Sequence, residues 1–269
     1  MPLKKNASGK RWVEMEVLVP GSPDQVWRAL ATGPGNAAWF IKAKIEERVG
    51  GELEFYFGPD AKSTGQVTFW EPPHAFGYVE RDWAEGAPPV ATEITVISRS
   101  GDQCVVRMVH SLFAASDDWD DQLEGFEGGW PGFFEVLRIY LAHFAGMEAV
   151  QAGAMLMRVQ EEPLAVWTRL TEGLGLAGTN VGERRTTSPR PEALTGTVEN
   201  IVQNAKSRYI MMRLDAPAPG VALWRTHAVN DGVHVSASFF FYGAEAAKQA
   251  AVSEPLWRNW FAELFPARA

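Results

Sequence analysis

Alternating hydrophobic and polar positions run through the first half of the chain and predict a series of β-strands. From Trp12 to Val19, valine and methionine side chains share one face while Glu14 and Glu16 lie on the other, which is typical of a half-buried strand. The same criterion predicts strands over residues 53–57, 65–70, 75–81, 92–98 and 103–113. The last two flank Arg99-Ser100-Gly101-Asp102 and predict a hairpin.

Two short helices are predicted between the first strand and the rest. Ser22 and Gln25 have the spacing of a capping box, and Pro23 occupies the first helical position, so a helix should begin there. It should end at Thr32-Gly33-Pro34-Gly35. A second short helix or turn is expected over 36–41, which carries Trp39 and Phe40.

A long amphipathic helix is predicted after an acidic connector over 117–127. Its apolar residues recur at three-and-four spacing, and most of them are aromatic: Trp130, Phe133, Phe134, Leu137, Tyr140, Leu141 and Phe144. Pro131 suits the first turn, and Gly128 and Gly129 allow a sharp entry into the helix. A helix with so wide an aromatic face should either pack on a large concave sheet or border a cavity.

Alternation along the predicted strand over residues 103–113 places His110 on the interior face of the sheet. Cys104, Val106, Met108, His110 and Leu112 share one face of residues 103–113. Arg107 lies on the other face and is costly to bury unpaired, so we assign that face to solvent. Antiparallel strands followed by one closing helix indicate an α+β fold rather than βαβ units.

The second half of the chain repeats the first. Pro, Val-Trp, Leu and Gly match between residues 22–33 and 162–173 at one offset (163 − 23 = 140). Thr64-Gly65-Gln66-Val67 matches Thr195-Gly196-Thr197-Val198, and Tyr78 matches Tyr209, at a second offset (195 − 64 = 209 − 78 = 131). The second half also contains a predicted strand over 150–159, before the repeated helix. After Tyr209 we predict a hairpin of strands 220–229 and 233–242 and a final helix over 244–265, with a turn or a kink at Pro255. We therefore predict two homologous domains, residues 12–145 and 149–266.

These features resemble the START/birch-pollen-allergen (SRPBCC) superfamily. Within it, the chain is most similar to the homologues of the activator of the heat-shock-protein ATPase. The matching residues are Pro23-x-x-Val26-Trp27-x-x-Leu30, Gly50-Gly51-Glu52, Gly65-x-Val67, the strand ending in His110-Ser111, and Gly128-Gly129-Trp130.

The resemblance implies two tandem helix-grip domains, each a curved antiparallel sheet wrapped on a long C-terminal helix. It also implies an internal cavity for a hydrophobic small molecule. The chaperone activator has an additional N-terminal domain for which this chain leaves no room, so we do not expect chaperone stimulation.

Composition narrows the function classes. At 269 residues and 46% hydrophobic content, the chain can form two cores. A net charge of −8 argues against nucleic-acid and anionic-membrane surfaces. One cysteine, Cys104, excludes an intrachain disulfide. The sequence has no secretory signal and no apolar run near the ~18 residues of a membrane span, which favours a cytoplasmic protein.

No motif for a metal or a cofactor is recognisable. His227 and His234 lie on neighbouring strands, but two histidines without a third ligand make a poor metal site. The acidic residues between Asp117 and Glu127 lack the spacing of a calcium loop. Cys104 should be an inert core residue. His110 could bind a ligand or act as an acid or base, but we favour a buried histidine held by a neighbour.

The aromatic surplus is the remaining indication of function. The aromatic side chains of the first domain either fill the core or line an apolar pocket that has a few polar anchors. The family resemblance favours the pocket. The ligand-binding residues predicted in the first domain are Trp39, Phe55, Phe57, Phe69, Phe76, Tyr78, His110, Trp130, Phe133, Phe134, Leu137 and Tyr140.

We therefore expect a protein that binds a hydrophobic, lipid-like small molecule without an assigned catalytic residue. One alternative is an enzyme of the aromatase/cyclase or hydrolase type that uses His110 with Tyr78 or Glu80. Another is a chaperone-linked or stress-response module that binds a protein partner. The sequence does not indicate the ligand or the oligomeric state.

Overall fold

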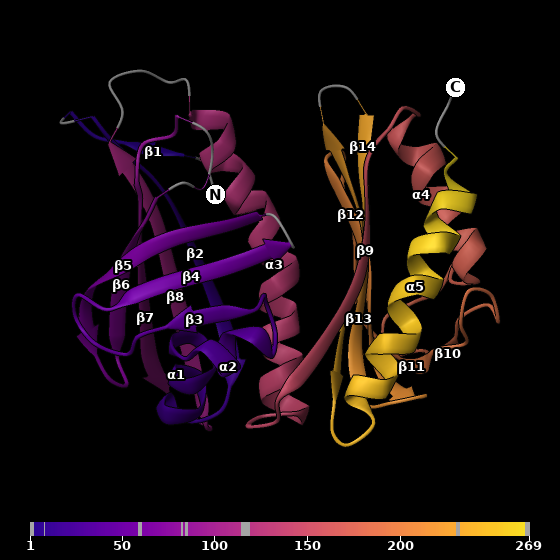
Figure 1. Cartoon of the computed structure of the whole chain (residues 1–269), viewed down its shortest axis with the longest axis horizontal. Coiled ribbons are helices and arrows are strands. Elements are labelled where there is room, and N and C mark those ends of the chain that lie inside the picture. Colours follow the sequence, from indigo (N-terminus) through magenta and orange to yellow (C-terminus); the bar gives the residue numbers. More distant parts are fainter. Residues whose placement is uncertain are drawn as a thin grey trace. The chain divides into compact units, whose positions relative to one another are not determined.

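The chain forms two compact units, residues 1–148 and 149–269. The computed structural model describes residues 3–7, 9–58, 61–81, 83, 86–113, 119–229 and 232–266, with only the backbone described at 58, 113, 121–128 and 157. Each unit combines an antiparallel sheet with a long C-terminal helix, so the predicted α+β class and tandem helix-grip architecture are confirmed (Figure 1).

The first unit wraps an eight-stranded antiparallel sheet around α3 (Asp120–His143), with α1 (Pro23–Ala31) and α2 (Gly33–Ala37) at one end (Figure 1). The sheet order is β1-β2-β8-β7-β6-β5-β4-β3. The strands are β1 (Lys4–Lys5), β2 (Lys10–Pro20), β3 (Ala43–Ile45), β4 (Glu52–Gly58), β5 (Ala61–Glu71), β6 (Ala75–Arg81), β7 (Val90–Arg99) and β8 (Gln103–Phe113).

The second unit packs α4 (Pro163–Leu174) and α5 (Ala246–Leu264) on a six-stranded sheet of order β10-β11-β12-β13-β14-β9. Its strands are β9 (Ala149–Val159), β10 (Arg184–Thr186), β11 (Thr195–Gln203), β12 (Ser207–Ala216), β13 (Gly220–Val229) and β14 (Gly232–Tyr242). Trp224, Phe239 and Trp257 meet in its core, with ring centroids 4.9–6.0 Å apart. Helix α5 is continuous through Pro255.

Helix α1 begins as the sequence predicts. The Ser22 hydroxyl accepts from the backbone N–H of Gln25 (3.4 Å), and the Gln25 side chain accepts from the backbone N–H of Ser22 (2.9 Å). This capping box satisfies N–H groups that have no partner within the helix, and Pro23 fills the first turn.

Helix α3 begins eleven residues before Pro131 (131 − 120 = 11), although the sequence pattern places Pro131 in the first turn of the helix. It starts at Asp120, so Gly128, Gly129 and Pro131 lie inside it and residues 120–127 are not a connector. Asp120 anchors the start through Arg11 (2.6 Å) and Lys5 (2.5 Å) on the sheet. The prediction was wrong because this anchoring, together with burial of the helix, outweighs the local helix-breaking tendency of Gly and Pro.

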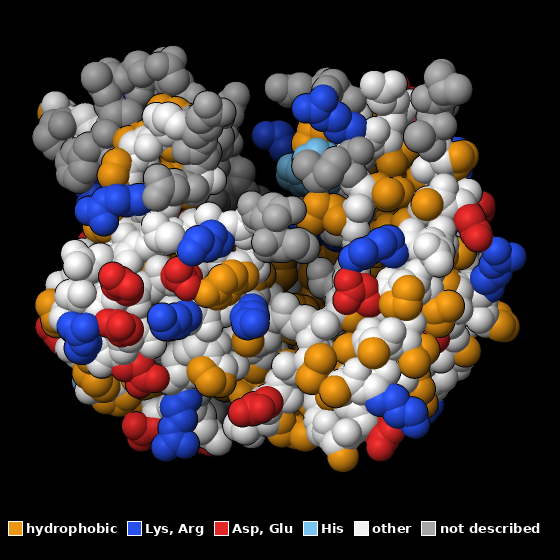
Figure 2. All heavy atoms as spheres, viewed as in Figure 1, with side chains coloured by type: hydrophobic (Ala, Val, Ile, Leu, Met, Phe, Trp, Pro, Cys, Tyr) orange, Lys and Arg blue, Asp and Glu red, His pale blue; other side chains and the backbone are white. Residues whose placement is uncertain are grey.

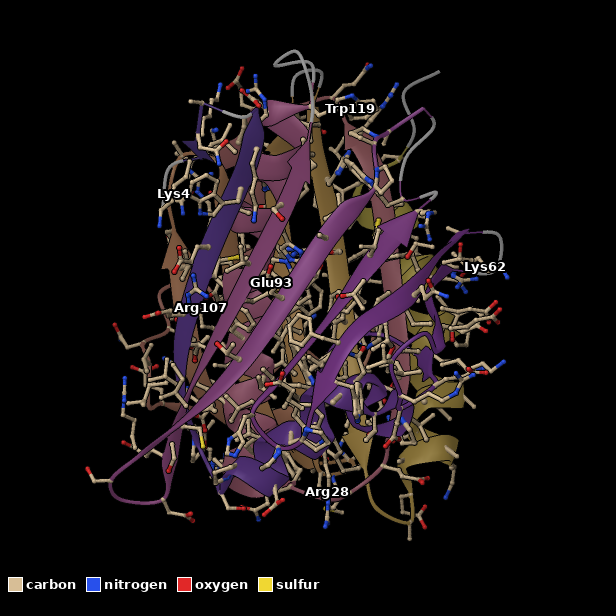
Figure 3. All side chains as sticks on the ribbon, turned by 90° about the vertical axis from the view of Figure 1, so that its left-hand side faces the viewer. Lys4, Arg28, Lys62, Glu93, Arg107 and Trp119 are labelled. Atoms are coloured by element: carbon tan, nitrogen blue, oxygen red, sulfur yellow. The ribbon has the colours of Figure 1, made fainter. Side chains whose placement is uncertain are left out.

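Arg107 lies on the solvent face of β8, as the sequence predicts. The Arg107 guanidinium donates to Glu14 on the neighbouring strand β2 (2.6 Å), and Lys4 donates to the same carboxylate (2.7 Å). Figure 3 looks onto this side of the sheet and labels Arg107, Glu93 and Lys4. The Arg107 and Lys4 hydrogen bonds lower the pKa of Glu14 to about 2.

The two sheets repeat one structural detail at equivalent positions. A Cβ at Gly65 would lie 2.4 Å from the Val79 carbonyl oxygen, and one at Gly196 would lie 2.1 Å from the Arg213 carbonyl oxygen. Each glycine therefore permits a close approach of two strands. In both units a β-bulge follows two residues later, between Val67 and Phe69 and between 198 and 200.

This register corrects one of the predicted matches between the two halves. Val67 lies opposite Tyr78, and its counterpart Val198 lies opposite Met212. Met212, rather than Tyr209, is therefore the structural equivalent of Tyr78. The sequence match failed because the stretch between the paired residues is three residues longer in the second unit (212 − 198 = 14 against 78 − 67 = 11), and an odd shift reverses the face.

Charged side chains of both signs are interspersed over the described part of the face drawn in Figure 2. None of the helices within the described ranges is both long and apolar enough to cross a bilayer.

Candidate functional site

The junction of α1 and α2 is a tightly packed corner. The Thr32 hydroxyl accepts from the backbone N–H of Gly35 (3.0 Å) and caps α2. A Cβ at Gly35 would lie 1.9 Å from the Arg28 carbonyl oxygen, so only glycine allows this approach. The indole N–H of Trp39 donates to the Ala29 carbonyl (2.9 Å). These contacts hold α2 and the segment after it against α1.

Two cross-strand rows on the concave face of the sheet form a second wall. In the first row, Tyr78 of β6 lies opposite Thr92 of β7, which lies opposite His110 of β8. Thr92 Oγ1 and His110 Nδ1 are hydrogen bonded at 2.8 Å. Because side chains alternate between the faces of a strand, the next row inward is also on this face. It is apolar and consists of Phe76, Ile94 and Met108.

Helix α3 supplies the third wall through Trp130 and Phe134. The Trp130 ring stacks on His110 with centroids 5.6 Å apart and on Phe134 at 5.5 Å. Phe40, from the segment after α2, lies 4.6 Å from Trp130. Trp39 completes the cluster against Phe134 at 6.4 Å. The aromatic residues of the helix therefore meet those that follow α2.

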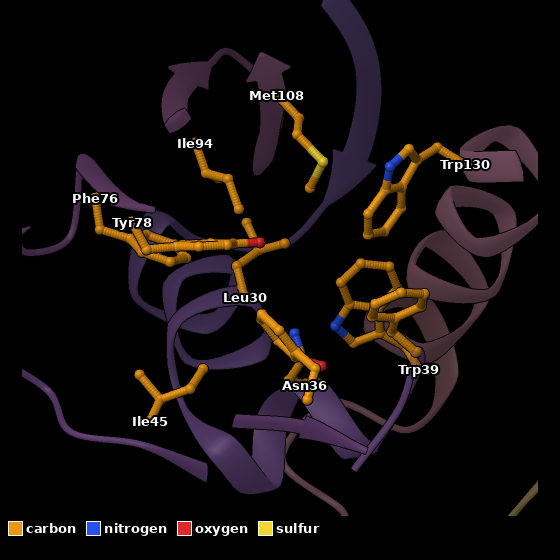
Figure 4. A pocket seen from close by; sticks show the side chains of 11 residues that line it. Leu30, Asn36, Trp39, Ile45, Phe76, Tyr78, Ile94, Met108 and Trp130 are labelled. Carbon is orange, nitrogen blue, oxygen red and sulfur yellow. The ribbon is translucent and has the colours of Figure 1, made fainter. Parts of the chain in front are cut away.

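A small cavity remains between the three walls (Figure 4). It measures about 10 Å³, counted as positions that the centre of a water molecule can occupy, which is room for about one water. The lining residues are Leu30, Asn36, Trp39, Phe40, Ile45, Phe55, Phe76, Tyr78, Ile94, Met108 and Trp130. At this cavity the side chains of the sheet and of α3 leave little empty space between them.

Polar atoms reach the cavity from two sides. The Tyr78 hydroxyl points inward from the sheet, and the Asn36 amide comes from α2 (Figure 4). Asn36 is only 6% exposed, and its Oδ1 has no hydrogen-bond partner among the described residues. A buried polar atom without a partner costs about 1–3 kcal/mol.

His110 is buried next to this cavity and is held in place by Thr92 and Trp130. Burial lowers its pKa to about 4, because the charged form loses its hydration. At neutral pH the imidazole is therefore uncharged. Its surroundings match those of a buried histidine fixed by a neighbour.

Tyr78 and Glu80 are also shifted away from the charged state. Burial raises the pKa of the Tyr78 hydroxyl most, and the charge of Glu80 raises it further. A side-chain hydrogen bond with Thr92 lowers this pKa and offsets part of the rise. Burial raises the pKa of Glu80, while Ser63 acts in the opposite direction. The concave face therefore disfavours charge.

The structure brings five of the twelve predicted ligand-binding residues into the cavity wall: Trp39, Phe55, Phe76, Tyr78 and Trp130. His110, Phe133 and Phe134 lie behind that wall and pack on Trp130. Leu137 and Tyr140 are buried further along α3 and do not line the cavity. The Tyr140 hydroxyl accepts instead from the backbone N–H of Gly146 (3.1 Å).

Phe57 and Phe69 were predicted to line the ligand site, but neither side chain lines the cavity. Phe57 is 56% exposed, because the pairing of β4 with β5 becomes irregular after Tyr56 and the strict alternation ends. Phe69 follows the bulge in β5, which reverses the facing of the residues after it. Its ring therefore covers Gly77, where a Cβ would lie 2.2 Å from it, and Trp70 packs on Trp27 and Phe76 instead.

Sequence reasoning missed six lining residues: Leu30, Asn36, Phe40, Ile45, Ile94 and Met108. Ile94 and Met108 could have been found, because cross-strand pairing places them beside Phe76. Asn36 gave no signal, since an asparagine after Thr-Gly-Pro-Gly is equally typical of an exposed turn.

A model of the family described as activator of Hsp90 ATPase homolog 1-like protein matches residues 20–142. No curated protein matches the sequence. Among described residues, no group of three or more His, Cys, Asp or Glu is arranged to hold a metal ion.

Solved structures similar to this chain include one- and two-domain proteins. DynU16, a protein of the dynemicin biosynthetic locus, is 16% identical, with 94% of this chain and 96% of that chain covered and a TM-score of 0.44. BexL, a di-domain ARO/CYC of the BE-7585A biosynthetic pathway, is 14% identical, with 96% and 100% covered and a TM-score of 0.44. The Aha1 dimer of Colwellia psychrerythraea is 20% identical, with 48% and 95% covered and a TM-score of 0.41. Likenesses at this level say nothing about activity.

Proposed function

Residues 20–142 belong to the activator of Hsp90 ATPase homolog 1-like family of helix-grip proteins, and from this premise we propose that the first unit binds a hydrophobic small molecule. The molecule binds between the curved sheet and α3, at the cavity lined by Trp39, Tyr78 and Trp130. The observation that carries the proposal is this cavity, which has aromatic walls and few polar atoms, the composition of small-molecule sites.

The second unit supports the proposal by contrast. The row Tyr78–Thr92–His110 corresponds by register to Met212–Ala222–Phe239 in the second sheet. The second unit is thus apolar at the positions where the first keeps polar groups. A core that needs only to be filled has no use for those groups, because buried polar atoms require partners.

Binding requires the wall to open, because about 10 Å³ holds no more than a water. Phe40, Trp130 and Phe133 are only partly buried, and they meet through ring contacts of 4.6–6.4 Å. Ring contacts at a partly exposed edge separate at less cost than contacts within the buried core. The ligand enters between α3 and the segment after α2.

A thermal-shift panel of uncharged lipids, aromatic compounds and polyketides tests the proposal. A ligand at 100 times its Kd should stabilise the protein by about 2.7 kcal/mol. Trp39 and Trp130 should report binding through a change in indole fluorescence.

Matched variants locate the site. Ile45→Trp replaces an aliphatic side chain of the cavity wall with a bulkier indole ring and should abolish the shift. Ile97→Trp makes the same exchange at a position that is 38% exposed on the outer side of β7 and should leave the shift unchanged. No response to any apolar class, or equal responses of both variants, contradicts the proposal.

The enzyme alternative receives less support from the same groups. A general acid or base works best with a pKa near the working pH. The pKa of His110 lies at about 4, and that of Tyr78 is raised. Both groups are therefore poorly placed to exchange protons at neutral pH.

A further inference from the structure

Asn36 is a buried polar side chain whose Oδ1 accepts no hydrogen bond from the described residues. Its backbone N–H donates to the Thr32 carbonyl (2.9 Å), and its backbone carbonyl accepts from Phe40 (2.9 Å) and Trp39 (3.3 Å). The turn is therefore closed by main-chain bonds and by the Thr32 cap. Asparagine side chains commonly hydrogen-bond their own turn, but no such bond is made here among the described residues.

The Asn36 side chain belongs instead to the cavity. It lines the cavity, is 6% exposed and leaves Oδ1 without a partner among the described residues. In Figure 4 its amide lies between Leu30 and Trp39, opposite the inward-pointing Tyr78. A buried amide oxygen without a partner among the described residues is best explained by a group that reaches it when a ligand binds.

We propose that Asn36 is the polar anchor of this site and selects uncharged aromatic ligands that carry a hydroxyl group. The inference rests on the proposed function and adds the ligand class and the residue that recognises it. An amide offers an acceptor and a donor in one plane, and a hydroxyl can both donate to Oδ1 and accept from Nδ2.

The other residues of the cavity wall explain why the ligand should be aromatic and uncharged. Tyr78 and Trp39 contribute aromatic rings to the lining, which favour a flat aromatic partner. The lining residues carry no ionised group, so a charged ligand would lose its hydration without gaining a counter-charge.

The test compares 2-naphthol with 2-methylnaphthalene, which has nearly the same shape but no hydroxyl. Equilibrium dialysis with the full chain should show at least about tenfold tighter binding of 2-naphthol, the effect of about one hydrogen bond. In Asn36→Leu this preference should disappear, while binding of 2-methylnaphthalene is retained.

Stability separates an anchor from a structural residue. Because Asn36 Oδ1 accepts no hydrogen bond from the described residues, Asn36→Leu and the smaller Asn36→Ala should not unfold the protein, and at least one should retain the wild-type Tm within a few degrees. A large loss of Tm in both variants overturns the proposal.

The outcomes distinguish the two proposals. Equal binding of both probes to the wild type overturns the role of Asn36 and leaves hydrophobic ligand binding intact. A preference for 2-naphthol that survives in Asn36→Leu and Asn36→Ala overturns it as well. If neither probe binds while other apolar compounds do, the hydroxyl-aromatic class is wrong and the proposed function stands. If nothing apolar binds, both fail.

Discussion

At the scale of single residues, His110 links the site to the pH dependence of folding. Its pKa is about 4 in the folded protein and about 6.5 in an unfolded chain. Between these values the unfolded state binds the extra proton, so stability is complete above pH 6.5 and is lost as the pH falls towards 4. The difference amounts to about 3 kcal/mol.

The prediction is that His110→Gln removes this loss. Denaturant unfolding between pH 7 and 4 should show the wild type losing about 3 kcal/mol more than the variant. Glu80 faces the same row, and because its pKa is raised it acts in the opposite sense, stabilising the fold as the pH falls. It is present in both proteins and cancels in the comparison. Parallel pH profiles would refute the assignment to His110.

Residue by residue, alternation sufficed where a strand is regular. It placed His110 and Tyr78 inward and Arg107 outward, because period two leaves only two choices. It failed at Phe69, where one bulged residue reverses the face. Asn36 could not be found at all, because its position depends on how α2 packs against α1 through Gly35, which is a tertiary contact.

At the scale of elements, one carboxylate links three side chains of α5 to the loop before β11. Glu192, from the loop before β11, accepts from Ser253 (2.8 Å), from the indole N–H of Trp257 (3.1 Å) and from Gln249. These donors are spaced four residues apart and share one helix face. Ser253 and Trp257 are fully buried, so the loss of their acceptor leaves two polar groups without water.

Glu192→Ala should therefore destabilise the second unit by about 2–4 kcal/mol. The matched control is Glu263→Ala, which removes a carboxylate from α5 itself. Glu263 pairs with Arg190 at the surface, where the side chains are 58% and 76% exposed, so its loss should cost less than about 1 kcal/mol. Guanidinium denaturation of both variants measures the difference, and equal costs would show that the Glu192 bonds are not net stabilising.

The ends of regular strands followed from the sequence, while the start of α3 did not. Period-two patterns identified β6, β8 and β13 with the bounds that the structure has. Helix α3 begins at Asp120 because Arg11 and Lys5, more than a hundred residues earlier, hold its first turn. Local signals at Gly128, Gly129 and Pro131 could not reveal that contact.

At the scale of the whole molecule, the duplication explains why one unit is proposed to bind a ligand and the other is not. The two sheets share the close-approach glycines Gly65 and Gly196 and the bulges that follow them, so their registers can be compared row by row. The polar row of the first sheet is apolar in the second. Trp224 and Trp257 occupy the interior of the second unit.

Hydrogen exchange of the full chain with and without a ligand found in the thermal-shift panel tests this division. Added protection should appear in α2, in the segment after it and around Trp130, because those elements must open to admit the ligand and close again on it. The amides of β12 to β14 should exchange at unchanged rates, because their core is already filled by side chains. Ile45→Trp, with ligand present, serves as the control and should abolish the protection. Protection concentrated in β12 to β14 would show that the second unit holds the ligand, and would reverse the roles assigned to the two units.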